Sequence, residues 1–225
     1  MQQKTKMPSK PSKALNKFRP HAYAWEKEYR TKGALWRGYN KPPALVRKGR
    51  VLELGCGNGK TLIPLAAQGL DVYGVDVSKT SLTLAKKALE EHGLKARLQE
   101  ASGDALPFKN GFFDAVYAIH VIEHMNAKER ENCAKEIARV LKKGGLAYFE
   151  AFAVGDARYG QGRKVERDTF RKGTNVWVHF FRSKEVERLF KKAGMHVDLV
   201  KEISRPERYG ATRLERKIIT AVLHS

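Results

Sequence analysis

Apolar and polar residues follow one another in blocks that predict strands and helices in turn. Val51–Leu54 is a short apolar run stopped by glycines, as expected of a buried strand, and residues 60–68 then suit a helix that ends at Gly69. Further runs predict strands at Asp71–Val77, Ala96–Ala101 and Phe113–Ile119. Single strands that alternate with helices are typical of a mainly parallel α/β sheet with right-handed crossovers.

The predicted helices between these strands have recognisable ends. Ser78 is the expected N-cap of a helix that ends at Gly93. Asn126 with Glu129 three residues later predicts a capping box. The helix that it opens is expected to run to the pair Gly144-Gly145, ahead of a fifth strand at Leu146–Ala151.

The final third of the chain has a different pattern. Residues 152–182 are rich in glycine, arginine and aromatic side chains without a clear period, which predicts an insertion or lid with one short strand at Val176–Phe181. Ser183 is the expected cap of one more helix, ended by Gly194. Two last strands are predicted at His196–Ile203 and at about residues 216–223.

Charge divides the chain into segments. The net charge is +20, and residues 1–50 hold 14 Lys/Arg against 2 Asp/Glu, whereas residues 51–150 hold 13 of each. We therefore expect a basic disordered tail at residues 1–20, a helical cover at residues 21–48 and one domain over residues 49–225. Such segregated charge suits an anionic partner, although a highly charged surface without a target has the same composition.

Several classes of protein are disfavoured by composition. The longest apolar run is far short of a membrane span, and no signal-peptide pattern is visible near Met1, so we expect a cytoplasmic protein without membrane contact. Cys56 and Cys133 have neither disulfide nor metal-ligand spacing, and we expect no metal site.

The glycine-rich segment after the first strand carries the main chemical signal. Gly55, Gly57 and Gly59 link a strand to a helix, where they allow a ligand to approach the backbone. Their spacing differs from the Gly-x-Gly-x-x-Gly of dinucleotide loops, and no Gly-Lys-Ser/Thr follows. Glu53, two residues before Gly55, would repel a pyrophosphate but suits an ammonium group.

Two more acids follow the next two predicted strands. Asp76 comes at the end of the second strand, where a carboxylate can accept hydrogen bonds from ribose hydroxyls. Asp104 follows the third strand, where an acid can accept from an adenine amino group. Either acid alone could be a cap or a solvated loop residue, and Asp76 alone would suit NAD equally. Three acids at successive strand ends are harder to explain in that way.

Four segments resemble the class I S-adenosylmethionine-dependent methyltransferases, in the group with ubiquinone-biosynthesis and tellurite-resistance-type enzymes. They are Val-Leu-Glu-Leu-Gly-Cys-Gly-Asn-Gly at 51–59, Val-Tyr-Gly-Val-Asp-Val-Ser at 72–78, Gly-Asp-Ala-Leu-Pro-Phe at 103–108 and Arg-Val-Leu-Lys-Lys-Gly-Gly-Leu at 139–146. The resemblance covers about residues 45–152. It implies a doubly wound, Rossmann-like seven-stranded sheet with helices on both faces and a reversed final hairpin.

The resemblance also implies roles for individual residues. The cofactor would be S-adenosylmethionine, released as S-adenosylhomocysteine, with the methionine end at Glu53 and the glycine loop, where Cys56 acts through its backbone. Asp76 and Val77 would lie at the ribose, and Asp104 and Ala105 at the adenine. The residues implied near the sulfonium follow the fourth strand: Ala118, Ile119 and His120.

Candidates for the acceptor side of the site are weaker. His120 is the first candidate for a general base and His179 in the predicted lid is the second, although His120 and His124 could equally support their loop. Tyr29 and Trp36 in the cover are candidates for a substrate lid or for core packing. No Asn/Asp-Pro-Pro-Tyr segment follows the fourth strand, which disfavours methylation of an exocyclic base amine in that style.

The acceptor remains open between two classes. A small anionic molecule is favoured by the group resemblance and by the absence of a separate RNA-binding module. RNA, tRNA above all, is favoured by the basic flanks and by aromatic residues interleaved with Lys and Arg between Tyr23 and Tyr39. A non-catalytic binding protein is a third possibility, disfavoured by the complete set of predicted cofactor residues.

Overall fold

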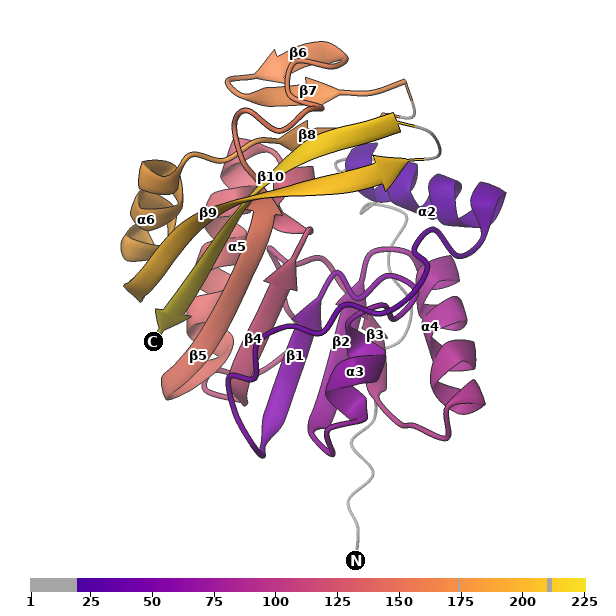
Figure 1. Ribbon diagram of the computed structural model, residues 1–225. Coiled ribbons are helices and arrows are strands. Elements are labelled where there is room, and N and C mark those ends of the chain that lie inside the picture. Colours follow the sequence, from indigo (N-terminus) through magenta and orange to yellow (C-terminus); the bar gives the residue numbers. More distant parts are fainter. Residues whose placement is uncertain (1–19, 174, 210–211) are drawn as a thin grey trace, which may run out of the picture.

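A seven-stranded sheet forms the centre of the molecule in a computed structural model that describes residues 20–173, 175–209 and 212–225 (Figure 1). In spatial order its strands are β3 (Arg97–Glu100), β2 (Asp71–Asp76), β1 (Arg50–Leu54), β4 (Phe113–Ile119), β5 (Leu141–Phe152), β10 (Thr212–His224) and β9 (His196–Tyr209). The first five are parallel, and β10 is antiparallel to both β5 and β9. The predicted mainly parallel α/β fold with a reversed final hairpin is confirmed. The predicted tail lies, apart from Pro20, outside the described residues.

Strand β4 shows how the sequence builds two cores, one on each face of the sheet. Val116 and Ala118 pack with α5 (Ala127–Val140) and α6 (Ser183–Lys192), whereas Ala115, Tyr117 and Ile119 pack with α3 (Leu62–Ala66) and α4 (Lys79–Glu91). Because successive side chains of a strand point to opposite faces, a strand covered on both faces must be apolar throughout. From Ala115 to Ile119 the strand is apolar for this reason, whereas Asp114 near its start is only partly buried and accepts a hydrogen bond from the Arg50 amide.

Two of the three N-caps that the sequence predicted are present in the structure. Ser78 caps α4, and its hydroxyl accepts a hydrogen bond from the Ser81 amide at 3.0 Å. Asn126 and Glu129 form the predicted capping box at the start of α5, with both reciprocal hydrogen bonds 3.0 Å long. The prediction for Ser183 is wrong, because Arg182 occupies the N-cap of α6 without a side-chain cap and the Ser183 hydroxyl donates instead to Glu202 on β9.

The junction between α5 and β5 also differs from the prediction. The helix ends at Val140 rather than at the glycine pair, and β5 begins at Leu141, which has extended backbone angles and pairs with Phe113. Gly144, with φ of 74°, then lies in an irregular stretch before the register with β4 resumes. The glycines therefore bend the start of a strand, whereas we expected them to stop the helix.

The predicted lid contains more structure than one short strand. Its β6 (Arg163–Glu166), β7 (Thr169–Arg171) and β8 (Trp177–His179) form a small antiparallel sheet. The β9–β10 hairpin is also longer than predicted. Its two strands pair with each other along their whole length, whereas β10 pairs with β5 only from Ile218 onward. The lid sheet and the free end of the hairpin lie beyond the carboxyl ends of β1 and β4, at one end of the molecule (Figure 1).

The predicted N-terminal cover, residues 21–48, contains one helix followed by a segment without helix or strand. Helix α2 (Pro20–Lys32) lies against α4, and residues 33–49 then cross the structure without helix or strand. Glu26 on α2 accepts hydrogen bonds from the hydroxyls of Ser78 at 2.7 Å and Thr80 at 2.8 Å. The helix is therefore fixed to the first turn of α4, over the carboxyl edge of the sheet. Among the described residues, no helix has the length and apolar character needed to cross a membrane.

The capping box of α5 gives a test of local stability. Replacing Asn126→Ala removes the acceptor for the Glu129 amide, and we expect the free energy of unfolding to fall by about 1 kcal/mol. Asn126→Ser retains a capping oxygen and should lose less. Urea unfolding monitored by circular dichroism measures both differences, and equal losses for the two variants would contradict this role of the cap.

Candidate active site

The glycine loop after β1 is closely covered by other parts of the chain. Gly55 and Gly57 have φ of 68° and 52°, in the left-handed region that glycine adopts readily. A Cβ atom at Gly55 would lie 2.5 Å from Cγ2 of Val121, and one at Gly57 would lie 2.5 Å from the hydroxyl oxygen of Tyr29. Side chains of Val121 and Tyr29 thus occupy the space that a Cβ atom would need, so the loop requires glycine at both positions.

Glu53 lies buried at the end of β1, two residues before this loop, and is 4% exposed. Burial raises the pKa of its carboxyl group well above the usual range, a hydrogen bond from Thr61 lowers that pKa, and the neighbouring charge of Asp76 raises it. The Oε2 atom of Glu53 has no hydrogen-bond partner in the described part of the chain. A buried carboxylate oxygen without a partner is costly, so this atom is suited to a cationic or hydrogen-donating ligand.

Asp76, the last residue of β2, connects the glycine loop to α4. One carboxylate oxygen accepts from the Gly57 amide and the other from the Ser78 amide, both at 2.9 Å. Burial raises the pKa of Asp76, whereas these two amide hydrogen bonds lower it. Each carboxylate oxygen retains a second lone pair, so Asp76 can position the loop and still accept a hydrogen bond from a ligand.

An open pocket with a volume of about 80 Å³ lies above this edge of the sheet. Seven of the predicted site residues line it: Tyr29 and Trp36 from the cover, Gly55 from the loop, Asp76 and Val77 after β2, and His120 and His124 after β4. Trp25 on α2, which sequence reasoning did not select as a site residue, also lines the pocket. Its ring meets the His124 ring edge-on at 4.7 Å.

Other predicted residues lie beside or beneath the pocket. Ala118 and Ile119 are buried in the two cores, and Cys56 is buried beneath the loop, near Gly74. Around Asp104 the pocket is lined by Ser102 and Gly103 instead, and the Ser102 hydroxyl donates to the Asp104 carboxylate. Further predicted residues that do not line the pocket are Glu53, Gly57, Gly59 and Ala105.

His120 follows β4 and lies between two carboxylates. Its Nδ1 is 2.8 Å from Oε1 of Glu123 and its Nε2 is 3.3 Å from Oε1 of Glu150. Burial lowers the pKa of His120, but the two carboxylates outweigh it and raise the pKa to about 9. His120 is therefore a cation at neutral pH, which is the wrong charge state for the predicted general base.

Glu150 was missed as a site residue, although the sequence contained a signal. It is the only acid within the apolar run Leu146–Phe152, and a carboxylate inside a buried strand usually has a specific partner. The carbonyl oxygen of Glu150 accepts from the His120 amide at 2.8 Å, and its side chain accepts from the Tyr148 hydroxyl at 2.9 Å. Glu150 therefore fixes both the backbone and the ring of His120.

The two other candidate histidines, His124 and His179, both contact residues of the lid sheet. His124 contacts the carbonyl oxygen of Trp177 on β8 through Nδ1 at 2.7 Å, which joins the pocket wall to the lid sheet. His179 is only 2% exposed, and its ring nitrogens contact Thr169 at 2.7 Å and Glu185 at 2.8 Å. It does not line the pocket, so its position does not suit the predicted role of a second base.

Known proteins resemble this chain in sequence. Residues 52–149 match the family of methyltransferase domains. A tRNA N(3)-cytidine methyltransferase METTL2 from Danio rerio is 28% identical over 65% of this chain and 44% of its own length. A ubiquinone biosynthesis O-methyltransferase from Pelagibacter ubique is 30% identical over 61% and 55%, respectively. The chain thus spans about half the length of these curated relatives.

Solved structures share the fold. A structure of an S-adenosylmethionine-dependent methyltransferase from Methanosarcina mazei aligns with a TM-score of 0.70 and 24% identity, covering 80% of this chain and 94% of that one. TehB from Haemophilus influenzae aligns with a TM-score of 0.63 and 16% identity, covering 89% and 67%. The chain therefore shares the class I methyltransferase fold, residues 52–149 match the methyltransferase domain family, and S-adenosylmethionine is the cofactor of the class I enzymes.

The residues present fit that cofactor. The partnerless oxygen of Glu53 is suited to an ammonium group, and Gly55 brings backbone without a side chain to the pocket wall. Asp76 has spare acceptor capacity at the pocket wall. In the described part of the chain, no three His, Cys, Asp or Glu side chains are grouped so that they could bind a metal.

The charge of His120 predicts a pH dependence of stability. Because its pKa is raised above the unfolded value of about 6.5, its contribution is complete below pH 6.5 and is lost as pH rises through about 9. Between pH 6.5 and 9.5 the free energy of unfolding should therefore fall by an amount on the order of 2 kcal/mol. His120→Asn, which tolerates the φ of 51°, should remove this part of the pH dependence. Unfolding free energies at pH 6.5 and 9.5 measure it, and identical pH profiles for both proteins would contradict the assignment.

Proposed function

We propose that the chain binds S-adenosylmethionine in the pocket and transfers its methyl group to an acceptor held beneath the lid. The observation that carries this proposal is that the partnerless Oε2 of Glu53, the backbone of Gly55 and the carboxylate of Asp76 lie at one edge of the sheet. Glu53 would accept from the ammonium group, Asp76 with Val77 would lie at the ribose, and the segment from Ser102 to Ala105, with Asp104, would lie at the adenine.

When bound, the cofactor supplies an electrophilic methyl group on a sulfonium, and S-adenosylhomocysteine is the product. The chain's own residues then have to align the acceptor and exclude water. Trp25, Tyr29 and Trp36 would cover the pocket from the N-terminal side, and the lid sheet would do so from above. His120, as a cation, would orient an anionic acceptor, and no proton transfer is assigned to it.

A small molecule with an anionic group is the acceptor that we favour. Its support is the cationic ring of His120 at the pocket wall, together with a lid that holds seven Lys and Arg residues against three acids over residues 152–182. The similarity to ubiquinone biosynthesis O-methyltransferases agrees with this class.

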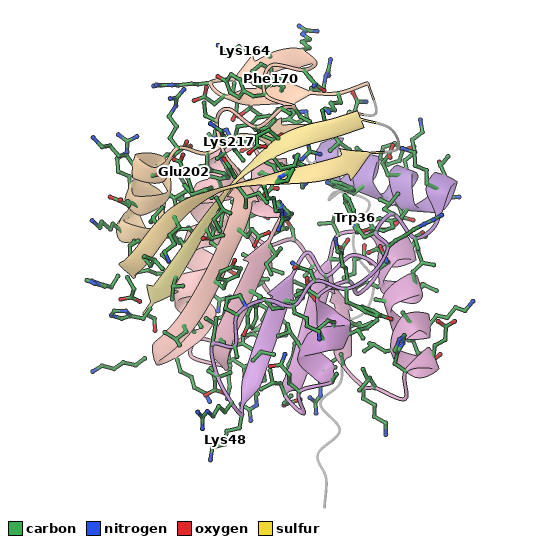
Figure 2. All side chains as sticks on the ribbon, viewed as in Figure 1. Trp36, Lys48, Lys164, Phe170, Glu202 and Lys217 are labelled. Atoms are coloured by element: carbon green, nitrogen blue, oxygen red, sulfur yellow. The ribbon has the colours of Figure 1, made fainter. Side chains whose placement is uncertain are left out.

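RNA is the second candidate, and a separate observation favours it. Trp36 and Tyr39 are about half exposed, and Arg163 and Lys164 are exposed on β6 (Figure 2). Exposed aromatic rings suit base stacking, and exposed cations suit phosphate contacts. The similarity to tRNA N(3)-cytidine methyltransferases agrees with this reading.

The experiment that tests the function is transfer of labelled methyl groups from S-adenosylmethionine into a cell extract that is afterwards separated into small-molecule, RNA and protein fractions. We expect label in the small-molecule fraction. Label in RNA alone, abolished by ribonuclease, would favour the second candidate. An absence of label in all fractions, with cofactor binding intact, would contradict methyl transfer.

Asp76→Ala should weaken binding of S-adenosylhomocysteine at least tenfold, because it removes the ribose acceptor and frees the Gly57 amide. Asp71→Ala is the matched control, since it removes the same carboxylate at the other end of β2. Isothermal titration calorimetry measures both affinities. Equal affinities for the two variants would show that the cofactor residues are wrongly assigned.

A further inference from the structure

The pocket is too small for the cofactor while the N-terminal cover stays in place. Its volume of about 80 Å³ is several times smaller than the roughly 300–1,000 Å³ of sites that hold cofactors and other small molecules. Trp25 and Tyr29 on α2, with Trp36 shortly after it, form one side of this pocket, and the sheet edge forms the other. A ligand as large as S-adenosylmethionine therefore needs the rings of α2 to move away from the sheet.

These rings are packed against the body of the molecule. Tyr29 is only 3% exposed, and its hydroxyl oxygen lies where a Cβ atom of Gly57 would be 2.5 Å away. The centroid of the Trp25 ring lies 6.3 Å from that of Tyr29 and 4.7 Å from that of His124. Closely packed rings have little freedom to turn in place, so the pocket widens when α2 itself shifts.

A single carboxylate, that of Glu26, attaches α2 to the start of α4. Its Oε2 accepts from the Ser78 hydroxyl at 2.7 Å and from the Thr80 amide at 3.2 Å, and its Oε1 accepts from the Thr80 hydroxyl at 2.8 Å. Burial raises the pKa of Glu26, but these hydrogen bonds outweigh it and lower the pKa below its usual value. The bonds are thus charge-assisted, at a helix N-terminus where a negative charge is favourable.

Ser78 connects this carboxylate to the cofactor residues. Its amide donates to Asp76 at 2.9 Å, while its hydroxyl donates to Glu26 and accepts from the Ser81 amide at 3.0 Å. The position of α2 is therefore linked, through one serine, to the carboxylate that we place at the ribose.

Gly33 supplies a point about which α2 can move. It follows the helix with φ of 70°, and outside its chain neighbours no described atom lies within 4 Å of the place of a Cβ atom. Beyond it, the Trp36 amide donates to Oδ1 of Asn58 at 3.2 Å, and Nδ2 of Asn58 donates to the Trp36 carbonyl at 2.9 Å. The chain is thus held to the glycine loop on one side of Gly33 and to α4 on the other, where α2 lies in Figure 1.

We propose that Glu26 is a latch that holds α2 in a closed position and so opposes cofactor binding. The cofactor enters when Glu26 leaves Ser78 and Thr80 and α2 moves outward about Gly33. The cover then lies over the ligand at a wider position, beyond the reach of these hydrogen bonds. This inference rests on the proposed function, because it takes the cofactor to bind in this pocket. Glu26 is a positioning residue that does not touch the ligand.

Removal of the latch should tighten binding of the cofactor product. In Glu26→Ala the closed position loses its hydrogen bonds, so a larger fraction of molecules can bind, and the Kd for S-adenosylhomocysteine should fall at least fivefold. The association rate should rise by a similar factor, while the dissociation rate should stay the same. Calorimetric titration measures the Kd, and stopped-flow measurement of tryptophan fluorescence gives the two rates.

Glu28→Ala is the matched control, since it removes a carboxylate of the same helix that pairs with Lys32 within the helix. It should bind S-adenosylhomocysteine as the unmodified chain does. Glu26→Gln retains an oxygen that can accept from one hydroxyl, so its gain in affinity should be smaller than that of Glu26→Ala. Binding by Glu26→Ala that is no tighter than binding by Glu28→Ala would overturn the latch.

Hydrogen exchange without ligand separates this inference from the proposed function. The amides of α2 should exchange faster in Glu26→Ala than in Glu28→Ala, because the helix opens more readily. Faster exchange in a chain that does not bind S-adenosylhomocysteine would support the latch and contradict the proposed function. Equal exchange in the two variants, with cofactor binding intact, would contradict the latch alone.

Discussion

Two carboxyl groups buried close together at the carboxyl edge of a parallel sheet, those of Glu53 and Asp76, constrain the arrangement around them. Burial raises the free energy of the charged form of both, and the charge of Asp76 adds to this cost at Glu53. Hydrogen bonds from the amides of Gly57 and Ser78 offset part of this cost at Asp76, and they fix the glycine loop against the start of α4. Glu53 has an oxygen without a partner, so a cationic ligand completes the site.

The same edge is covered by elements whose polar contacts are equally specific. Glu26 fixes α2 to the start of α4, and His124 links the pocket wall to the lid through Trp177. On the acceptor side, the carboxylates of Glu123 and Glu150 hold His120 as a cation. The site is thus anionic where the cofactor ammonium would lie and cationic where we place the acceptor. This separation of charge allows both ligands to bind side by side.

Sequence reasoning succeeded where one local rule decided the outcome. The buried part of β4, Ala115 to Ile119, is apolar throughout, and Asn126 with Glu129 predicts the capping box of α5. It failed where long-range contacts decide: the pairing of Leu141 with Phe113 ends α5 early, and Ser183 bonds to β9 instead of capping α6. His120 looked like a base because the spacing of residues does not reveal that Glu150, thirty residues later, lies against its ring.

The central claim is that Glu53 receives the cofactor's ammonium group. Calorimetric titration of S-adenosylhomocysteine near neutral pH, in buffers of different ionisation enthalpy, tests it directly, because a carboxyl group with a raised pKa must release its proton when it pairs with a cation. The account predicts saturable binding at one site with net proton release that Glu53→Gln lacks. Equal proton release by the unmodified chain and Glu53→Gln, or no saturable binding, would contradict it.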